Sequence, residues 1–319
     1  MGVVKPFVAL CVAAGMAIIP AQADSRTAKL NANTIGLMAP EYQWLPQTIS
    51  IATAVQHEDG LRILPILGAG TLQSVSDLAQ LESIDAVLLT LDTLTYAKAQ
   101  GLLEGMEGKI TYLARLQPVT WALVVPKATT SIASLANQRV ATGPTGTAGF
   151  VAGELLFNAL DVPFRRVPKQ GVEALGNLDK GAADAALVDA NTLRSSKLDG
   201  ARFHILPLPL PEALTSTYSQ IIITSAEAPT LIASDGDVET VSAALAVLVF
   251  SGKSKTQQER LRRFSEALFR NASTLKLNNN IAADIPGWNR HQASVEALKI
   301  LATQAKIEPE NQLQQGDGQ

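Results

Sequence analysis

The sequence has little cysteine, few aromatic residues and no excess of basic charge. Its only cysteine is Cys11, so the chain beyond residue 23 contains none. Disulfides, thiolate metal sites and cysteine nucleophiles are thereby excluded from that part. Aromatic residues make up 5% of the chain, and 26 Lys and Arg residues stand against 29 Asp and Glu residues. Because neither base-stacking surfaces nor a phosphate-binding charge excess is present, we expect no nucleic-acid partner.

Motifs of the common catalytic and metal centres are missing as well. The three histidines, His57, His204 and His291, lie far apart in the sequence, and neither H-E-x-x-H nor G-x-S-x-G occurs. We therefore expect no metal, no cofactor and no enzymatic activity. A catalytic triad assembled by the fold stays an alternative, because triads are defined by geometry.

The N-terminus has the pattern of a secretory signal peptide. Lys5 precedes an apolar run over 7–19, and Ala21, Gln22 and Ala23 supply the small residues of a cleavage site. The run is shorter than the roughly 20 residues that span a bilayer, which argues against an anchor. We predict a signal peptide over 1–23, cleavage after Ala23 and a periplasmic location.

Strand and helix patterns alternate along most of the 319 residues, a length that suggests about two domains. We expect strands at 34–37, 61–67, 86–91, 119–125, 139–142, 185–188, 203–208 and 221–224. Helices are expected at 44–57, 72–81, 148–160 and 172–178. After 224 the pattern is helical, with apolar faces over 257–271 and 290–305, and the polar tail 308–319 is expected to be disordered. This alternation predicts two α/β units in series, followed by a helical C-terminal part.

Glycine loops precede two of the expected helices. Gly68-Ala69-Gly70-Thr71 leads into one helix, and Gly143-Pro144-Thr145-Gly146-Thr147 leads into the other. Thr71 is expected to cap the first helix, and Thr145 or Thr147 the second. Helix N-termini carry unpaired N–H groups and about half a positive charge, so two of them across a cleft form an anion site without Lys or Arg. An ordinary strand–helix turn is the alternative for each loop.

Several segments together resemble a known family, the TAXI-type solute-binding proteins of TRAP (tripartite ATP-independent periplasmic) transporters. The similar segments, in chain order, are LPILGAGTLQSV (64–75), SIDAVLLTLD (83–92), SLANQRVATGPTGT (134–147), GAADAA (181–186) and Tyr218. The resemblance implies a two-lobed, type II-like periplasmic-binding-protein fold. Lobe 1 would comprise 24–126 and 215–307, and lobe 2 would comprise 127–214. Two crossover strands near 121–125 and 218–224 would form the hinge.

The resemblance also implies a function. The protein would act as a monomer, capture a small organic anion or amino acid between its lobes, and deliver it to TRAP membrane subunits. A periplasmic module that senses a ligand for a signalling receptor is one alternative, and a periplasmic enzyme on the same fold is another. The expected ligand-binding residues are Gly70, Thr71, Gln73, Thr90 and Asp92 in lobe 1, Thr145, Gly146 and Thr147 in lobe 2, and Tyr42, Trp44 and Tyr218 as an aromatic wall.

Two of these expectations have competing interpretations. Core packing is an equal alternative for Trp44, because tryptophans are highly buried on average. The loop Ala39-Pro40-Glu41-Tyr42-Gln43-Trp44 departs from the family pattern, which usually has glycines here. We expect Glu41 to disfavour an acidic ligand, unless it points to solvent or meets a ligand amine.

Overall fold

The computed structural model describes residues 33–56, 60–106, 108–194, 196–232, 236–252, 254–277 and 281–316, with side chains up to residue 304. The expected signal peptide and His57 lie outside the described residues. Within these ranges, no helix combines the length and the apolar character needed to cross a membrane.

The first sheet holds the N-terminal strands and one strand from the C-terminal part. Its order is β2 (Arg62–Leu67), β1 (Thr34–Ala39), β3 (Ala86–Thr90), β12 (Leu245–Phe250) and β4 (Ile110–Arg115). Strand β1 runs parallel to β2 and β3, whereas β12 is antiparallel to β3 and β4. Every residue of β1 is buried, as expected for a strand that helices cover on both faces.

Helices cover both faces of this sheet. Ile35 and Leu37 pack in the cluster that includes α1 (Leu45–Val55) and α7 (Lys255–Arg270), whereas Met38 packs with α2 (Thr71–Gln80) and α3 (Leu91–Ala99). The alternation follows from the two-residue period of a strand. A one-turn 3₁₀ helix, η1 (Tyr42–Trp44), connects β1 to α1.

The second sheet contains the middle of the chain. Its order is β10 (Tyr218–Thr224), β11 (Asp237–Ala243), β5 (Val119–Pro126), β8 (Ala185–Asp189), β6 (Arg139–Ala141) and β7 (Arg165–Val167), and β9 (Phe203–Leu206) also pairs with β5. Helix α4 (Ala148–Ala159) packs on the face that carries Leu123 and Leu187, and α5 (Gly171–Asp179) packs on the opposite face. The short helices η3 (Ile132–Leu135), α6 (Ala190–Leu193) and η4 (Glu212–Leu214) lie in connections.

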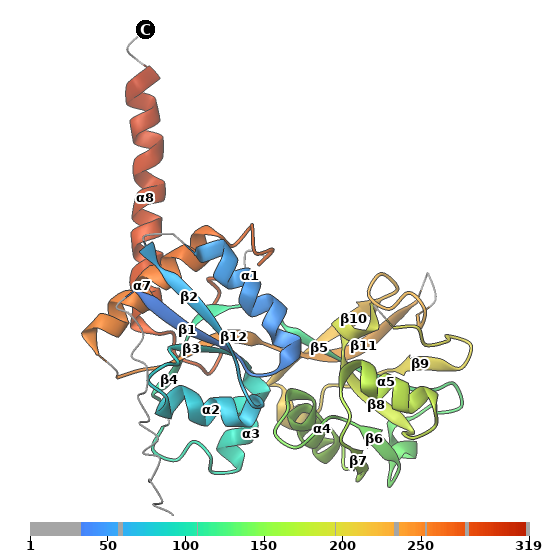
Figure 1. The fold of residues 1–319 in the computed structure, drawn as a ribbon. Helices are drawn as coiled ribbons and strands as arrows, with labels where there is room; N and C mark the ends of the chain where they lie inside the picture. Colours follow the sequence, from blue (N-terminus) through green and yellow to red (C-terminus); the bar gives the residue numbers. More distant parts are fainter. Residues whose placement is uncertain are drawn as a thin grey trace, which may run out of the picture.

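The two sheets form two lobes joined by two short connections (Figure 1). The chain leaves the first sheet through 116–118 and returns through Ala244. These connections run side by side, since the Leu116 N–H donates to the Leu245 carbonyl at 2.8 Å. The predicted two-lobed α/β fold of the type II-like periplasmic-binding-protein class is confirmed by this topology.

The hinge strands differ from those that the resemblance implies. Strands β5 and β10 lie wholly in the second sheet, which draws on residues 119–243 rather than 127–214. Compared with the predicted lobe 2, the second sheet contains one more strand on the N-terminal side, β5, and two more on the C-terminal side, β10 and β11. A strand next to the hinge pairs with strands of only one of the two sheets. The sequence alone does not show which sheet it joins.

The expected helical C-terminal part is wrong for residues 237–250. This segment forms β11 and β12, which both lie inside their sheets. Its run of Leu245–Val249 is buried on both faces, and a short apolar run of this kind does not distinguish a strand from a buried helix. The two later helices are confirmed as α7 and α8 (Gln292–Gly316).

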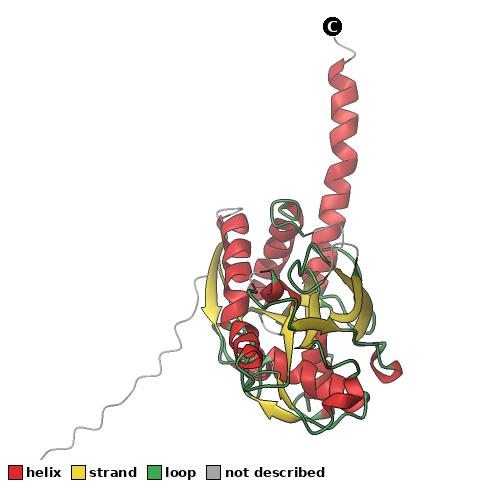
Figure 2. Ribbon diagram, turned by 90° about the vertical axis from the view of Figure 1, so that its right-hand side faces the viewer, coloured by secondary structure: helices red, strands yellow, loops and turns green. Residues whose placement is uncertain are grey.

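Helix α8 continues beyond the segment that the sequence predicts to be helical. It runs to Gly316, through most of the tail 308–319 for which disorder is expected. Figure 2 shows it projecting from the rest of the molecule. The tail contains Glu and Gln residues, which are good helix formers, but also Pro309, so its composition by itself does not account for the longer helix.

Candidate ligand site between the lobes

Loops at the carboxyl ends of strands from both lobes meet at the lobe boundary. The Leu72 N–H donates to the Gly146 carbonyl at 3.0 Å. A Cβ atom on Gly70 would lie 3.2 Å from the same carbonyl oxygen, and the φ angle of Gly70 is 128°, a region that favours glycine. The two glycine loops therefore contact each other directly, whereas the sequence predicted that they face each other across a cleft.

The Glu41 side chain joins the two lobes beside this contact. Its Oε1 accepts a hydrogen bond from the Thr71 hydroxyl of the first lobe at 2.5 Å. The same oxygen accepts one from the backbone N–H of Ala148, the first residue of α4 in the second lobe, at 2.7 Å. Glu41 is only 6% exposed. Its carboxylate thus occupies the partly positive N-terminus of α4.

Burial raises the pKa of Glu41 above its ordinary value of 4.5. The Thr71 hydroxyl, the Ala148 N–H and the neighbouring Gln170 side chain lower the pKa, but burial is the largest cause. Two oxygens at this position lack hydrogen bonds, because Glu41 Oε2 and Gln170 Oε1 are buried without a partner within the described chain. Buried polar atoms of this kind are costly unless a water or ligand pairs with them.

The loop before α4 owes its shape to Gly143 and Thr147. The Thr147 side chain accepts from the Phe150 N–H at 3.3 Å and donates to the Pro144 carbonyl at 2.8 Å. A Cβ on Gly143 would lie 2.5 Å from the Thr147 hydroxyl, so the loop requires glycine there. Thr147 is the cap of α4, which confirms one of the two predicted caps. The prediction that Thr71 caps α2 is wrong: Gly70 takes the cap position, and the Thr71 hydroxyl turns to Glu41.

Thr147→Val is expected to destabilise the protein by about 1 kcal/mol, because valine can neither cap α4 nor donate to Pro144. Thr147→Ser keeps both hydrogen bonds and should stay close to wild type. Urea unfolding of the three proteins measures the difference. Equal stabilities of the Val and Ser variants would show that the cap contributes nothing to the loop.

Asp92 and Tyr218 form a second contact between the lobes. Asp92 is fully buried in the first turn of α3, and its Oδ2 accepts from the Tyr218 hydroxyl at 2.8 Å. Its Oδ1 accepts from the Thr93 N–H at 2.7 Å, while the hydroxyls of Thr90 and Thr93 lie 3.1 Å apart. Burial raises the pKa of Asp92, and burial together with the Asp92 charge raises the pKa of Tyr218 well above 10.0. Tyr218 therefore stays a protonated donor to Asp92.

Helices α3 and α4 complete the contact between the lobes. The Tyr96 and Phe150 rings meet edge to face at 5.7 Å, and the Arg166 guanidinium lies 4.2 Å from the centre of the Phe150 ring. The hydroxyls of Thr95 and Thr217 lie 3.2 Å apart across the same boundary. Polar and aromatic contacts thus hold the lobes in a closed arrangement.

Among the other expected ligand residues, the structure separates exposed from buried ones. Tyr42 is 77% exposed, and Thr145 is also exposed. Gln73 is exposed as well, and its amide donates to Asp77 on α2 at 2.8 Å. Trp44 packs in the core cluster that contains α1. Their contact with a ligand stays a prediction.

Two residues of the site were missed as binding groups. Glu41 was expected to oppose an acidic ligand, yet it neither points to solvent nor meets an amine, since its own carboxylate is seated on α4. Gln170, before α5, carried no sequence signal, because its proximity to Glu41 arises only from the packing of the lobes. For Glu41 the sequence did contain a signal. An acidic residue lies in the loop 39–44, and the helix that starts at Ala148 has no basic residue at its N-terminus to pair with an acid.

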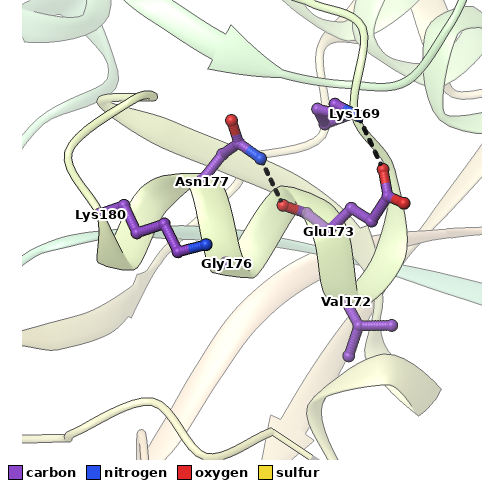
Figure 3. Close-up of a pocket in the computed structure, with 6 residues that line it drawn as sticks. All are labelled: Lys169, Val172, Glu173, Gly176, Asn177 and Lys180. Carbon is purple, nitrogen blue, oxygen red and sulfur yellow. Dashed lines mark hydrogen bonds and ion pairs between the residues drawn. The ribbon is translucent and has the colours of Figure 1, made fainter.

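A hollow of about 330 Å³ lies outside the lobe contact, on the surface of α5 (Figure 3). Lys169, Val172, Glu173, Gly176, Asn177 and Lys180 line it. Lys169 is paired with Glu173 at 3.0 Å, and the Asn177 amide donates to the Glu173 carbonyl. None of the predicted ligand residues lines this hollow.

The described residues contain no group of three or more His, Cys, Asp or Glu side chains arranged to hold a metal ion. His204 Nε2 lies 2.9 Å from the Thr129 carbonyl, and His291 is buried, with burial lowering its pKa. Within the described part of the chain, the His204 ring thus contacts a backbone carbonyl and the His291 ring is buried.

Comparison with known proteins finds similarity among solved structures only. No family model matches the chain, and no curated protein matches it. The chain is similar to a TctC solute binding protein from Polaromonas, with 16% identity, a TM-score of 0.48, and coverage of 83% of this chain and 87% of that one. It is also similar to the periplasmic VFT2 domain of Bordetella pertussis BvgS, with 12% identity, a TM-score of 0.45, and coverage of 77% of this chain and 93% of that one. For XAC2383 from Xanthomonas citri the identity is 13%, the TM-score is 0.49, and the coverage is 85% of this chain and 98% of that one. The likeness concerns the path of the chain, since few residues are shared.

Proposed function

We propose that this protein is a ligand-binding module that holds the carboxylate of a small organic anion or amino acid between its two lobes. One observation carries the proposal: a single carboxylate oxygen, here that of Glu41, is hydrogen-bonded by Thr71 of one lobe and by Ala148 of the other. A ligand favours a closed form only through contacts that it makes with both lobes at once. This position supplies such contacts.

The chemistry of the position favours a carboxylate over other groups. Its donors are a hydroxyl and a backbone N–H at the start of a helix of 12 residues, which together favour a compact anion. Hydrogen bonds to charged groups are the stronger ones, and burial in the closed form shields them from salt.

For the biological role, we propose that the protein works in the periplasm and delivers its solute to TRAP-type membrane subunits. Support comes from the signal-peptide pattern of residues 1–23 and from the family resemblance of the glycine loops. Uptake of labelled solute into vesicles that contain those subunits, with and without this protein, tests the role. Uptake that is independent of the protein would favour the sensory alternative.

Ligand binding itself is tested by thermal unfolding in the presence of small carboxylates, amino acids and their amides. A ligand that binds only the folded protein raises its melting temperature. We expect a carboxylate to raise the melting temperature and its amide to have little effect. In a Glu41→Ala protein, where no carboxylate of the chain competes for the same hydrogen bond, Thr71→Val should weaken binding about tenfold or more, because it removes a hydrogen bond to a charged group.

Thr95→Val provides the matched control for that substitution. Thr95 also lies at the lobe boundary, but its hydroxyl pairs with Thr217 and the Leu91 carbonyl rather than with the Glu41 carboxylate. In the same background, Thr95→Val should weaken ligand binding far less than Thr71→Val does, because the hydrogen bonds at the carboxylate position are kept. Equal losses in both variants would indicate a general effect on closure and would count against a carboxylate site at Thr71.

A further inference from the structure

The Glu41 side chain occupies the position that the proposed function assigns to a solute carboxylate. Its Oε1 takes both interlobe hydrogen bonds, from Thr71 and Ala148, although 107 residues separate Glu41 from Ala148 in the sequence. The glycine loops beside it touch through the Leu72–Gly146 hydrogen bond. The closed arrangement is thus complete with a carboxylate that the chain itself provides.

Two observations indicate that this carboxylate is a replaceable occupant rather than a fixed part of the core. Glu41 is only 6% exposed, and its Oε2 is buried without a hydrogen-bond partner within the described chain. A permanently buried carboxylate normally has both oxygens satisfied. Burial also raises the pKa of Glu41, so its charged form is held at a cost.

The surroundings of Glu41 allow its side chain to leave while the backbone stays in place. The Gly68 and Gly70 N–H groups hold the loop by hydrogen bonds to the Ala39 and Pro40 carbonyls at 2.7 and 2.9 Å. The next residue, Tyr42, is 77% exposed, so the loop borders solvent. Once the lobes part, rotation about side-chain bonds is enough to move the carboxylate into water.

We propose that Glu41 is an internal ligand, which keeps the lobes closed in the free protein and must be displaced by the carboxylate of an incoming solute. The inference rests on the proposed function in taking this position as the solute site. It adds that the resting state is closed and that the solute competes with a residue of the chain. Removing Glu41 therefore opens the free protein and increases its affinity for solute.

The experiment replaces the missing carboxylate from solution. Glu41→Ala lacks one CH₂ and the carboxylate, which together correspond to acetate. We expect small-angle X-ray scattering to give a larger radius of gyration for this variant than for wild type. Acetate, titrated to about 100 mM because so small a ligand binds weakly, should return the radius toward the wild-type value and raise the melting temperature. Acetamide and chloride at equal concentrations should do neither.

Three further variants serve as controls. Glu212→Ala removes an exposed glutamate and should behave as wild type, without a response to acetate. Glu41→Gln keeps an oxygen that accepts from Thr71 and Ala148 and fills the same volume. Because this amide is tethered to the chain, its effective concentration is far higher than that of free acetamide, so the variant should stay closed and ignore acetate. Glu41→Ser is a second truncation, for use if Glu41→Ala fails to fold, and should respond to acetate as Glu41→Ala does.

The results separate this inference from the proposed function. If Glu41→Ala is as compact as wild type, or if acetate changes the radius and melting temperature of wild type and Glu212→Ala as much as those of Glu41→Ala, the internal ligand is refuted. If a solute found in the thermal screen binds wild type and Glu41→Ala with equal affinity, the inference fails while the proposed function stands. If acetate closes Glu41→Ala but no solute binds either protein, the internal ligand stands and the proposed function fails. We expect several-fold tighter solute binding by Glu41→Ala, because a competing closed state is removed.

Discussion

Gly149→Ala should lower the free energy of unfolding by about 1–3 kcal/mol or more, because the new methyl group has no room. A Cβ on Gly149 would lie 2.4 Å from the backbone carbonyl oxygen of Thr142, which no side-chain rotation can relieve. The N-terminus of α4 would have to move away from β6. Since Ala148 precedes this residue, its hydrogen bond to Glu41 should weaken at the same time.

Gly176→Ala is the matched control for that substitution. Gly176 also lies within a helix, α5, but a Cβ there would meet no atom within 4 Å. Alanine in a helix interior is more favourable than glycine by about 0.5–1 kcal/mol, so this variant should be slightly more stable than wild type. Denaturant unfolding monitored by circular dichroism measures both changes. A Gly149→Ala protein as stable as Gly176→Ala would contradict the close packing of α4 against Thr142.

Asp92→Ala should destabilise the protein by about 2–4 kcal/mol, because it leaves the Tyr218 hydroxyl and the Thr93 N–H buried without an acceptor. Asp92→Asn keeps one carbonyl oxygen in the same place and should cost less. Tyr218→Phe removes only the hydroxyl, so combining it with Asp92→Ala should add little to the loss. A full additional loss in the double variant would mean that the two residues do not interact.

The loss of folding stability caused by Asp92→Asn should depend on pH. Burial raises the pKa of Asp92 in the folded protein above its ordinary value of 3.8, so the folded state binds the proton more tightly than the unfolded state does. The wild-type stability that depends on this group is therefore fully present below 3.8 and falls as the pH rises through the raised pKa. Asparagine does not titrate. We expect the stability of wild type minus that of the Asn variant, from urea unfolding, to decrease with rising pH. A constant difference from pH 4 to pH 8 would contradict the burial of an ionisable Asp92.

The lobe contact differs in kind from an ordinary domain interface. Both of its buried carboxylates, Glu41 and Asp92, have pKa values raised mainly by burial. Each lies in the first lobe and accepts a hydrogen bond from the second. Closing the lobes therefore desolvates two acids, and the hydrogen bonds offset only part of that cost. We expect this cost to lower the stability of the closed arrangement relative to one in which the two acids meet water.

Local patterns in the sequence were enough for most of the fold. The apolar segments predicted β1, β2, β3, β5 and β8, and the glycine loops predicted where α2 and α4 begin. These features depend on residues that are near one another in the chain, such as Thr147 and the Phe150 N–H that it caps. Strand β12 escaped prediction because it is buried on both faces by partners distant in sequence, so its own residues show no alternation.

The site shows the same division. The sequence by itself determined that the N-terminus of α4 offers N–H groups and partial positive charge without a basic residue, since both follow from the backbone of any helix. Only the tertiary structure decided which acid meets that charge. The distance between Glu41 and Ala148 depends on how two sheets pack across two connections, and no local pattern encodes that packing.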